Sequence, residues 1–273
     1  MRQKRNPPRQ PLAQKRPKRT AQKPLPTSKN LKAAHPANAG PPPRGQTKGT
    51  GAKKVAAGPA SRRAPAAVRA PEIFDRLRRA YPGAHCALEF QSPFQLLVAT
   101  ILSAQCTDKR VNMVTPALFR RYATPAAMSA AKPEELEEMI KSTGFFRNKT
   151  RSLLGMSTAI AEQHGGAVPS DMEQLVKLPG VGRKTANVVL GNAFNRNEGI
   201  VVDTHVTRVS QRLALTRNED AVKIEQDLMP LFPRDEWTLL AHLLIEHGRQ
   251  ICVARNPKCD QCPLSDLCPS SRV

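Results

Sequence analysis

The strongest constraint on the fold is a series of helical patterns that fills the chain after residue 70. Ser92 and Pro93 form a typical helix start, and the apolar residues behind them recur at helical spacing: Phe94, Leu97, Val98, Ile101 and Leu102. Further helices are expected from Pro133 onward and over 149–164, 170–177, 183–194, 204–214, 220–231 and 235–247. The only strand-like stretch, 199–202, is too short to build a sheet. An all-α fold is therefore predicted.

Basic charge is concentrated in the first 70 residues. The chain has 43 Lys and Arg against 22 Asp and Glu, and 18 of the basic residues but no acidic residue lie within 1–70. This segment also holds 12 of the 25 prolines and no Phe, Trp or Tyr. It cannot bury enough apolar surface to offset the entropy of ordering, so a disordered, basic, proline-rich tail is predicted over 1–70. The tail could bind DNA phosphates or act as a solubilising extension, and the sequence favours neither.

Several classes of protein are excluded by what the sequence lacks. It has no secretory apolar segment and no apolar run of about 18 residues, so we expect no membrane partner. The density of prolines and the scarcity of serine argue against an organelle transit peptide. Six cysteines, four of them clustered near the end, indicate a metal site in a reducing compartment rather than a disulfide framework.

A glycine-rich turn, Leu178-Pro179-Gly180-Val181-Gly182, connects two of the predicted helices. Two glycines spaced two apart allow a sharp turn and a close approach to another molecule. Their N–H groups, with those of the next helix start, could bind a phosphate. Taken alone, the glycines slightly favour the alternative of an ordinary tight turn with glycine caps.

Two residues after this turn have side chains suited to catalysis, a lysine and an aspartate. Lys184 falls in the first turn of the next helix, where the helix dipole disfavours a cation, and a lysine amine is a nucleophile. A phosphate contact at the surface would explain it too. Asp203 precedes a helical run and is predicted as its N-cap. Residues so far apart in the chain cannot share a helix face, so only tertiary folding could bring them together.

The segments Leu178–Val189 (LPGVGRKTANVV) and Val201–His205 (VVDTH) resemble the signature of the endonuclease III family of helix-hairpin-helix DNA glycosylases. The resemblance extends from about Ile73 to Cys268. It implies two helical domains with a cleft between them. Residues 86–196 would form a six-helix domain with the helix-hairpin-helix motif, and 71–85 with 197–273 a terminal-helix domain with an iron–sulfur cluster.

The resemblance also implies a bifunctional DNA glycosylase/AP lyase of base excision repair. Lys184 would attack the sugar C1′, and Asp203 would stabilise the developing sugar cation. The enzyme would remove oxidised pyrimidines and nick the strand 3′ to the abasic site by β-elimination. We expect a monomer that acts on double-stranded DNA with damaged pyrimidines or abasic sites, in a bacterial cytoplasm at the nucleoid; a nuclear or organellar location stays open.

Further DNA contacts are carried over from the family, because the target nucleotide must leave the base stack. Gln105, in the segment SAQCTD, would fill the vacated space, and Phe145 would be a second plug where the family pattern has an aliphatic residue. Loop packing is the alternative for both. The remaining expected contacts lie in the hairpin and in a basic loop: Gly180, Val181, Gly182, Arg183, Arg255 and Lys258. A solvated basic loop is the alternative for the last two.

Four cysteines end the chain with spacings of six, two and five residues: Cys252, Cys259, Cys262 and Cys268. Zinc sites usually have two Cys-x2-Cys pairs, and only one is present, whereas four thiolates also suit a [4Fe–4S] cluster. The family uses this spacing for such a cluster, so a [4Fe–4S] cofactor is predicted.

Two other functions stay open from the sequence. One is an adenine-mismatch or mismatch glycosylase of the same superfamily, although those enzymes resemble the chain without a lysine at position 184. The other is a non-catalytic DNA-binding module with a metal-stapled tail, which would need no nucleophile.

Overall fold

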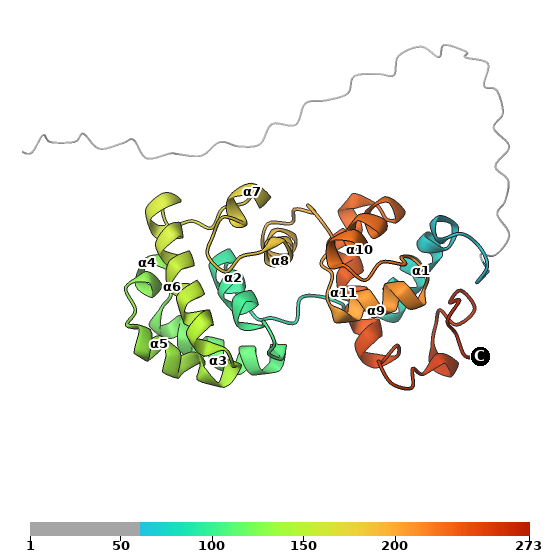
Figure 1. Ribbon diagram of the computed structural model, residues 1–273, viewed down its shortest axis with the longest axis horizontal. Helices are drawn as coiled ribbons and strands as arrows, with labels where there is room; N and C mark the ends of the chain where they lie inside the picture. The colour runs from blue at the N-terminus through green and yellow to red at the C-terminus, as the bar shows by residue number, and fades with distance from the viewer. Residues whose placement is uncertain (1–60) are drawn as a thin grey trace, which may run out of the picture. The chain divides into compact units, whose positions relative to one another are not determined.

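The computed structural model describes residues 61–273, and each regular element in that range is helical (Figure 1). The α-helices are α1 (Ala66–Ala80), α2 (Pro93–Leu102), α3 (Asp108–Arg121), α4 (Pro125–Ser129), α5 (Pro133–Ile140), α6 (Phe146–Gln163), α7 (Met172–Leu175), α8 (Arg183–Ala193), α9 (Thr204–Arg212), α10 (Ala221–Leu228) and α11 (Trp237–Gln250). Short 3-10 turns are η1 (Lys141–Thr143), η2 (Met229–Leu231), η3 (Arg234–Glu236) and η4 (Cys259–Gln261). The all-α prediction is confirmed. Within 61–273, no helix is both long and apolar enough to span a bilayer.

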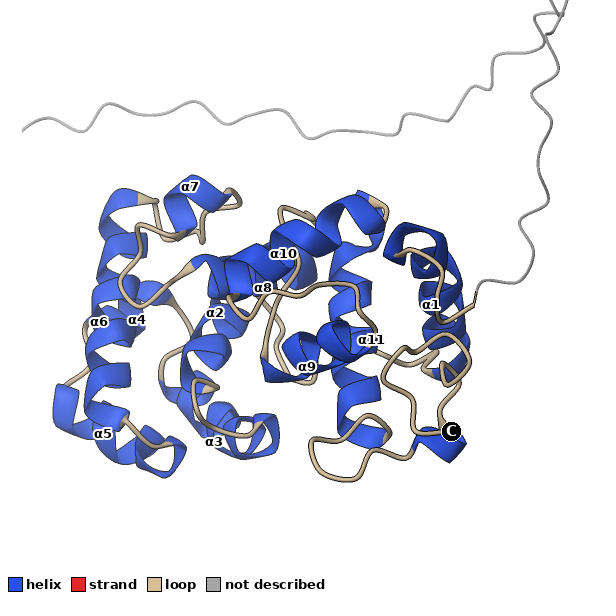
Figure 2. Cartoon of the chain, turned by 45° about the vertical axis from the view of Figure 1, so that its right-hand side comes forward, coloured by secondary structure: helices blue, strands red, loops and turns tan. Residues whose placement is uncertain are grey.

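The helices bury two separate apolar clusters. One is built from residues of α2–α8 and the segments between them, and we call this part the first lobe. The other combines α1 with residues 200–267 and is called the second lobe. Figures 1 and 2 show α2–α7 together on one side and α1 beside the carboxy-terminal segment on the other. The second lobe is therefore assembled from chain segments on both sides of the first.

The first lobe has one more helix than the resemblance implied. Residues 86–196 contain seven α-helices rather than six, and two of them, α4 and α7, are short, with five and four residues. Each has its own N-cap, since the Thr124 side chain accepts from the Ala127 N–H and the Asp171 side chain from the Gln174 N–H.

The predicted and observed helix starts agree where the sequence offers one clear N-cap residue. Ser92 accepts a hydrogen bond from the Gln95 N–H, as predicted for an N-cap followed by proline. The start expected at Ser170 is wrong by one residue, because Asp171 is the cap. The helix expected from 149 begins three residues earlier, at Phe146.

The predicted end of the last helix is also wrong. Gly248 lies inside α11, which continues to Gln250. A Cβ built on Gly248 would lie 3.0 Å from the Cβ of His205 and 3.2 Å from a guanidinium nitrogen of Arg208. This glycine lets α9 and α11 approach each other closely, so it serves packing rather than termination.

The boundary of the predicted tail needs a correction. Helix α1 begins at Ala66, inside the predicted disordered segment, and Arg69 is buried within it. The Arg69 guanidinium donates to the carbonyls of Leu213 and Leu267, at 2.6 and 3.1 Å. Tertiary contacts therefore order this alanine-rich stretch, which composition alone does not reveal. The rest of the tail prediction, over 1–60, lies outside the described residues.

Candidate active site and metal centre

The turn before α8 places Lys184 at an exposed helix start. Gly180 has φ +78°, and a Cβ there would lie 2.5 Å from the Ser152 Cβ, so both its backbone and its surroundings require glycine. Val181 is buried and anchors the turn, so its side chain is not available to DNA. Lys184 is exposed, and within residues 61–273 no hydrogen bond or ion pair engages its ammonium. The amine is thus free to meet a ligand.

Gly182 differs from Gly180. It is the N-cap of α8, with φ −94°, a conformation open to any residue. Among residues 61–273, no atom lies within 4 Å of the position that a Cβ on Gly182 would take. Because the protein itself does not require glycine here, the open space fits the predicted approach of a phosphate to the backbone.

Asp203 caps α9 and is held firmly by it. Its Oδ1 accepts from the N–H groups of His205 and Val206, both at 2.8 Å. The N-cap prediction is confirmed. One carboxylate oxygen is committed to the helix, so the side chain has a fixed orientation, and within the described chain the second oxygen has no recorded partner.

The fold brings Lys184 and Asp203 to one cavity. Both line a pocket of about 140 Å³ between the lobes, and both also line an adjoining open groove. Gln105 lies on the wall of the same groove. Three predicted site residues, distant in sequence, therefore share one surface.

Two polar contacts cross the lobes around this cavity. Arg249 of α11 pairs with Asp108 at the start of α3, with 2.6 Å between guanidinium and carboxylate. His242 of α11 lies 2.8 Å from the Asn192 Oδ1 of α8. Burial lowers the pKa of His242 to about 4, with a smaller contribution from the nearby His85, so the ring is neutral at pH 7. Sequence analysis missed these residues because no local pattern links positions so far apart.

The two predicted plug residues share an uncommon backbone conformation. Gln105 has φ 53° and Phe145 has φ 49°, both in the left-handed region that non-glycine residues rarely adopt. Phe145 is 62% exposed, which is unusual for a large apolar side chain. It does not line the cavity, and its position outside the pocket fits a role against DNA rather than in the chemistry.

Arg183, an expected DNA contact, is engaged in an ion pair within the protein. Its guanidinium makes two hydrogen bonds to the buried carboxylate of Glu225, at 2.8 and 3.0 Å, and so links α8 to α10. The same carboxylate accepts from the Asn187 amide at 3.0 Å. A DNA contact by Arg183 stays a prediction, and its observed contacts are structural.

The four clustered cysteines line one cavity in the second lobe. No group of three or more His, Cys, Asp or Glu side chains among residues 61–273 converges tightly enough for a single metal ion. Zinc needs its sulfur ligands about 2.3 Å from one point, whereas a [4Fe–4S] cluster separates its four thiolates widely. Four cysteines around one cavity supply the four-thiolate ligand set of a [4Fe–4S] cluster. Cys252, Cys259, Cys262 and Cys268 would hold the cluster, which fixes the surrounding loop.

Two arginines on α9 hold the cysteine loop. Arg212 donates to the Val253 and Ala254 carbonyls at 2.8 and 2.9 Å and lies 3.3 Å from the Cys252 Sγ. Arg208 donates to the Cys252 carbonyl at 3.0 Å. Because Asp203 caps the same helix, α9 connects the cysteine loop to the cavity.

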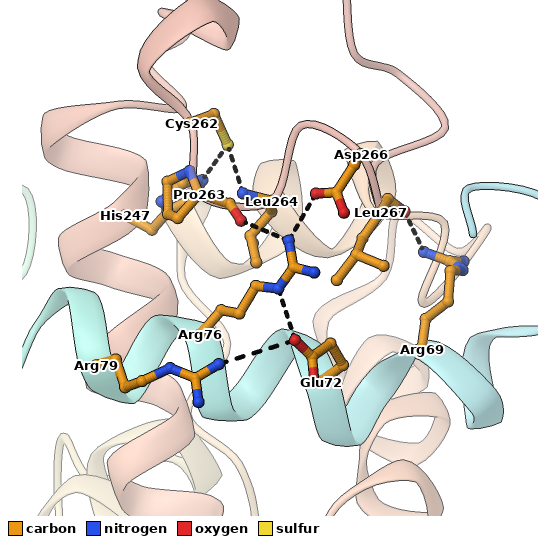
Figure 3. A network of polar contacts seen from close by, with 10 residues as sticks. All are labelled: Arg69, Glu72, Arg76, Arg79, His247, Cys262, Pro263, Leu264, Asp266 and Leu267. Carbon is orange, nitrogen blue, oxygen red and sulfur yellow. Dashed lines mark hydrogen bonds and ion pairs between the residues drawn. The ribbon is translucent and has the colours of Figure 1, made fainter. Parts of the chain in front are cut away.

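Helix α1 holds the other side of this loop (Figure 3). Arg76 donates to the Pro263 carbonyl at 3.1 Å and to Asp266 at 2.6 Å. Figure 3 also shows the Cys262 sulfur beside the Leu264 N–H and His247, at 3.4 and 3.6 Å. Such contacts tune the stability and potential of a bound cluster.

Arg255 and Lys258 are exposed on the loop between Cys252 and Cys259. Their positions leave both side chains available to phosphates. Contact with DNA stays a prediction for each.

Comparisons with known proteins agree with this site. Residues 98–234 match the HhH-GPD superfamily of base excision DNA repair proteins, and residues 252–268 match the iron-sulfur binding domain of endonuclease III. The first match contains Lys184 and Asp203, and the second begins and ends at cysteines of the cluster.

Individual relatives extend the match to nearly the whole described chain. Endonuclease III of Synechocystis sp. is 54% identical over 75% of this chain and 94% of its own length. The Escherichia coli enzyme is 42% identical over 72% and 93%. The solved structure of a trapped endonuclease III–DNA covalent intermediate has a TM-score of 0.72 and 44% identity, and covers 75% of this chain and 96% of that one. The chain is a DNA glycosylase/AP lyase with a [4Fe–4S] cluster and belongs to the endonuclease III family.

Proposed function

We propose that this chain removes oxidised pyrimidines from double-stranded DNA and cleaves the resulting abasic site, with Lys184 as nucleophile and Asp203 as its partner carboxylate. The observation that carries the proposal is the cavity that both residues line although they come from different helices. The trapped covalent DNA intermediate of a similar protein supports a covalent step.

The geometry divides the chemistry between the two side chains. The Lys184 amine, which has no partner among residues 61–273, forms a bond to the sugar C1′ as the bond from C1′ to the base breaks and the base leaves with the electron pair. Positive charge develops on the sugar in this step. Asp203 stabilises that charge with a carboxylate whose orientation is fixed by the α9 backbone.

Strand cleavage follows from the same covalent bond. Once the sugar ring opens, the adduct is a Schiff base between Lys184 and C1′, which makes the proton at C2′ acidic. Loss of that proton and departure of the 3′ oxygen break the strand 3′ to the lesion. The amine is returned when water hydrolyses the Schiff base.

Borohydride reduction tests the role of Lys184 because it converts the Schiff base into a stable adduct. Wild-type protein is expected to crosslink to a duplex with an abasic site, and Lys184→Gln is expected to give no adduct. Lys223→Gln is the matched control, because Lys223 is also exposed in the first turn of a helix, α10. An undiminished adduct with Lys184→Gln would refute the assignment.

Substrate class is tested separately, with two duplexes. We expect base release from a duplex with an oxidised thymine, and little release of adenine from a mismatch. The reverse preference would favour an adenine-mismatch glycosylase.

A further inference from the structure

A lysine outside the cavity is buried in the first lobe. Lys149, in the second turn of α6, is only 5% exposed. Its Nζ donates to two backbone carbonyls, those of Leu102 and Thr143, both at 2.8 Å. Within residues 61–273, no carboxylate lies within ion-pair distance of it. A buried ammonium without a counter-charge is costly, so a residue needed only for packing would be apolar here.

The two carbonyls belong to two different loops. Leu102 ends α2, and the loop that follows carries Gln105. Thr143 ends η1 and directly precedes Gly144 and Phe145. The backbone N–H of Lys149 also donates to the Phe145 carbonyl at 3.1 Å. One residue therefore fastens the loop of each predicted plug, and its cation lies at the negative end of the α2 dipole.

Both plug residues need such support. Gln105 and Phe145 have φ values of 53° and 49°, a strained conformation for residues other than glycine that persists only when the surroundings enforce it. Without the shared contact, each loop could relax independently.

We propose that Lys149 is a positioning residue that couples the Gln105 and Phe145 loops, so that both side chains enter the duplex together around the extruded nucleotide. This inference rests on the proposed function. Lys149 does not touch the reacting sugar. It positions the two loops whose side chains fill the space that the extruded nucleotide leaves in the duplex. The structure thus assigns it to nucleotide extrusion and not to bond breaking.

The test compares two substrates for the same chemistry. One is a fully paired duplex with an abasic site. The other has the abasic site inside a bubble of unpaired bases, where no stack has to be opened. The rate of borohydride trapping is measured for wild type, Lys149→Met and the control Lys132→Met. Methionine keeps most of the side-chain length and removes the donor. Lys132 is a lysine of the same lobe with a 78% exposed side chain.

Lys149→Met is expected to slow trapping on the paired duplex by roughly tenfold, the effect of losing about 1.4 kcal/mol of transition-state stabilisation. On the bubble substrate, its rate should stay within about twofold of wild type, a small change on the same scale. Lys132→Met should match wild type on both. The absorbance of the iron–sulfur cluster and the thermal midpoint are recorded for each protein to confirm comparable folding.

Two outcomes would overturn the proposal. Equal trapping by Lys149→Met and wild type on the duplex would show that the coupling has no effect on extrusion. An equal loss on both substrates would assign Lys149 to general stability rather than to the loops. Failure of the proposed function looks different, because wild-type protein would then form no adduct on either substrate.

Discussion

The two lobes hold their reacting residues in opposite ways. In the first lobe, Lys184 is carried by a helix that packs into an apolar cluster, and within the described chain its ammonium makes no polar contact. In the second lobe, Asp203 is tied to the α9 backbone, and α9 is tied to the cysteine loop. A carboxylate that stabilises developing charge works best when it is preorganised, and the capping hydrogen bonds give Asp203 a fixed orientation.

Hydrogen bonds from two helices hold the loop that carries the cluster cysteines. Arg208 and Arg212 of α9 and Arg76 of α1 donate to its backbone carbonyls. A cluster that fixes this loop therefore also fixes the helix that presents Asp203. Asp203 is thus held by backbone hydrogen bonds, whereas within residues 61–273 no polar contact holds the Lys184 ammonium.

The largest expected effect is on the rate of base release, when the charge of Asp203 is removed. Asp203→Asn should keep the cap, because the amide oxygen can still accept from the backbone, but should lose the negative charge that faces the cavity. Base release should slow by about a thousandfold, typical of losing a preorganised electrostatic group. Single-turnover kinetics on a damaged duplex would measure this.

A second aspartate provides the control for that substitution. Asp220 caps α10 by the same pattern, with its Oδ1 accepting from the Val222 and Lys223 N–H groups at 3.1 and 3.0 Å. Asp220→Asn should leave base release unchanged. A similar loss in both variants would mean that capping, and not the charge at the cavity, is what Asp203 contributes.

The next effect is on stability and on the lifetime of the cluster, when the hydrogen bonds from Arg212 to the cysteine loop are removed. Arg212→Met removes several charge-assisted hydrogen bonds and should lower the free energy of unfolding by about 3 kcal/mol. The cluster absorbance should also bleach faster in air, since the loop is less constrained. Denaturant unfolding and absorbance decay would measure the two effects.

Arg78→Met is the matched control, because Arg78 is 56% exposed and pairs with Asp75 on the surface of α1. Surface pairs of this kind contribute little, so its stability should stay near that of wild type. Equal cluster lifetimes in Arg212→Met and wild type would contradict a mechanical link between α9 and the loop.

The last effect appears only at acidic pH and concerns the contact between the lobes at His242. Its pKa in the folded protein is about 4, below the ordinary value of 6.5, so the unfolded chain binds more protons between these values. The stability that the neutral ring contributes is present above pH 6.5 and is lost as pH falls toward 4, by at most about 3 kcal/mol.

His242→Gln should therefore reduce the loss of stability between pH 6.5 and 4. Denaturant unfolding of both proteins across this range measures the slope directly. Identical slopes for His242→Gln and wild type would mean that the ring is accessible to protons in the folded protein.

The two lobes also differ in how well the sequence predicts their helix boundaries. In the first lobe, capping residues such as Ser92 and regular apolar spacing predicted α2, α5, α6, α7 and α8, whereas α3 and α4 were not predicted. The start of α1 was missed because Arg69 is ordered by the carbonyls of Leu213 and Leu267, far along the chain. Helix α11 continues past its predicted end at 247 because Gly248 lets α9 approach closely, a contact that exists only in the folded protein.

The same limit applies to the site. Lys184, Asp203 and the cysteines stood out by local pattern and by resemblance. No local signal marks Lys149, since a lysine in a helical stretch is usually solvated and its two acceptors belong to other segments. Arg249 and Asp108 likewise become partners only when the lobes meet.

The central claim is that the free amine on α8 is the group that bonds to DNA. Reduced crosslinks between the wild-type protein and abasic-site DNA can be digested with protease and nuclease and sequenced by mass spectrometry. The account predicts that the sugar remnant is attached to the peptide containing Lys184, at that residue. A remnant attached to another lysine or to the amino terminus would contradict it.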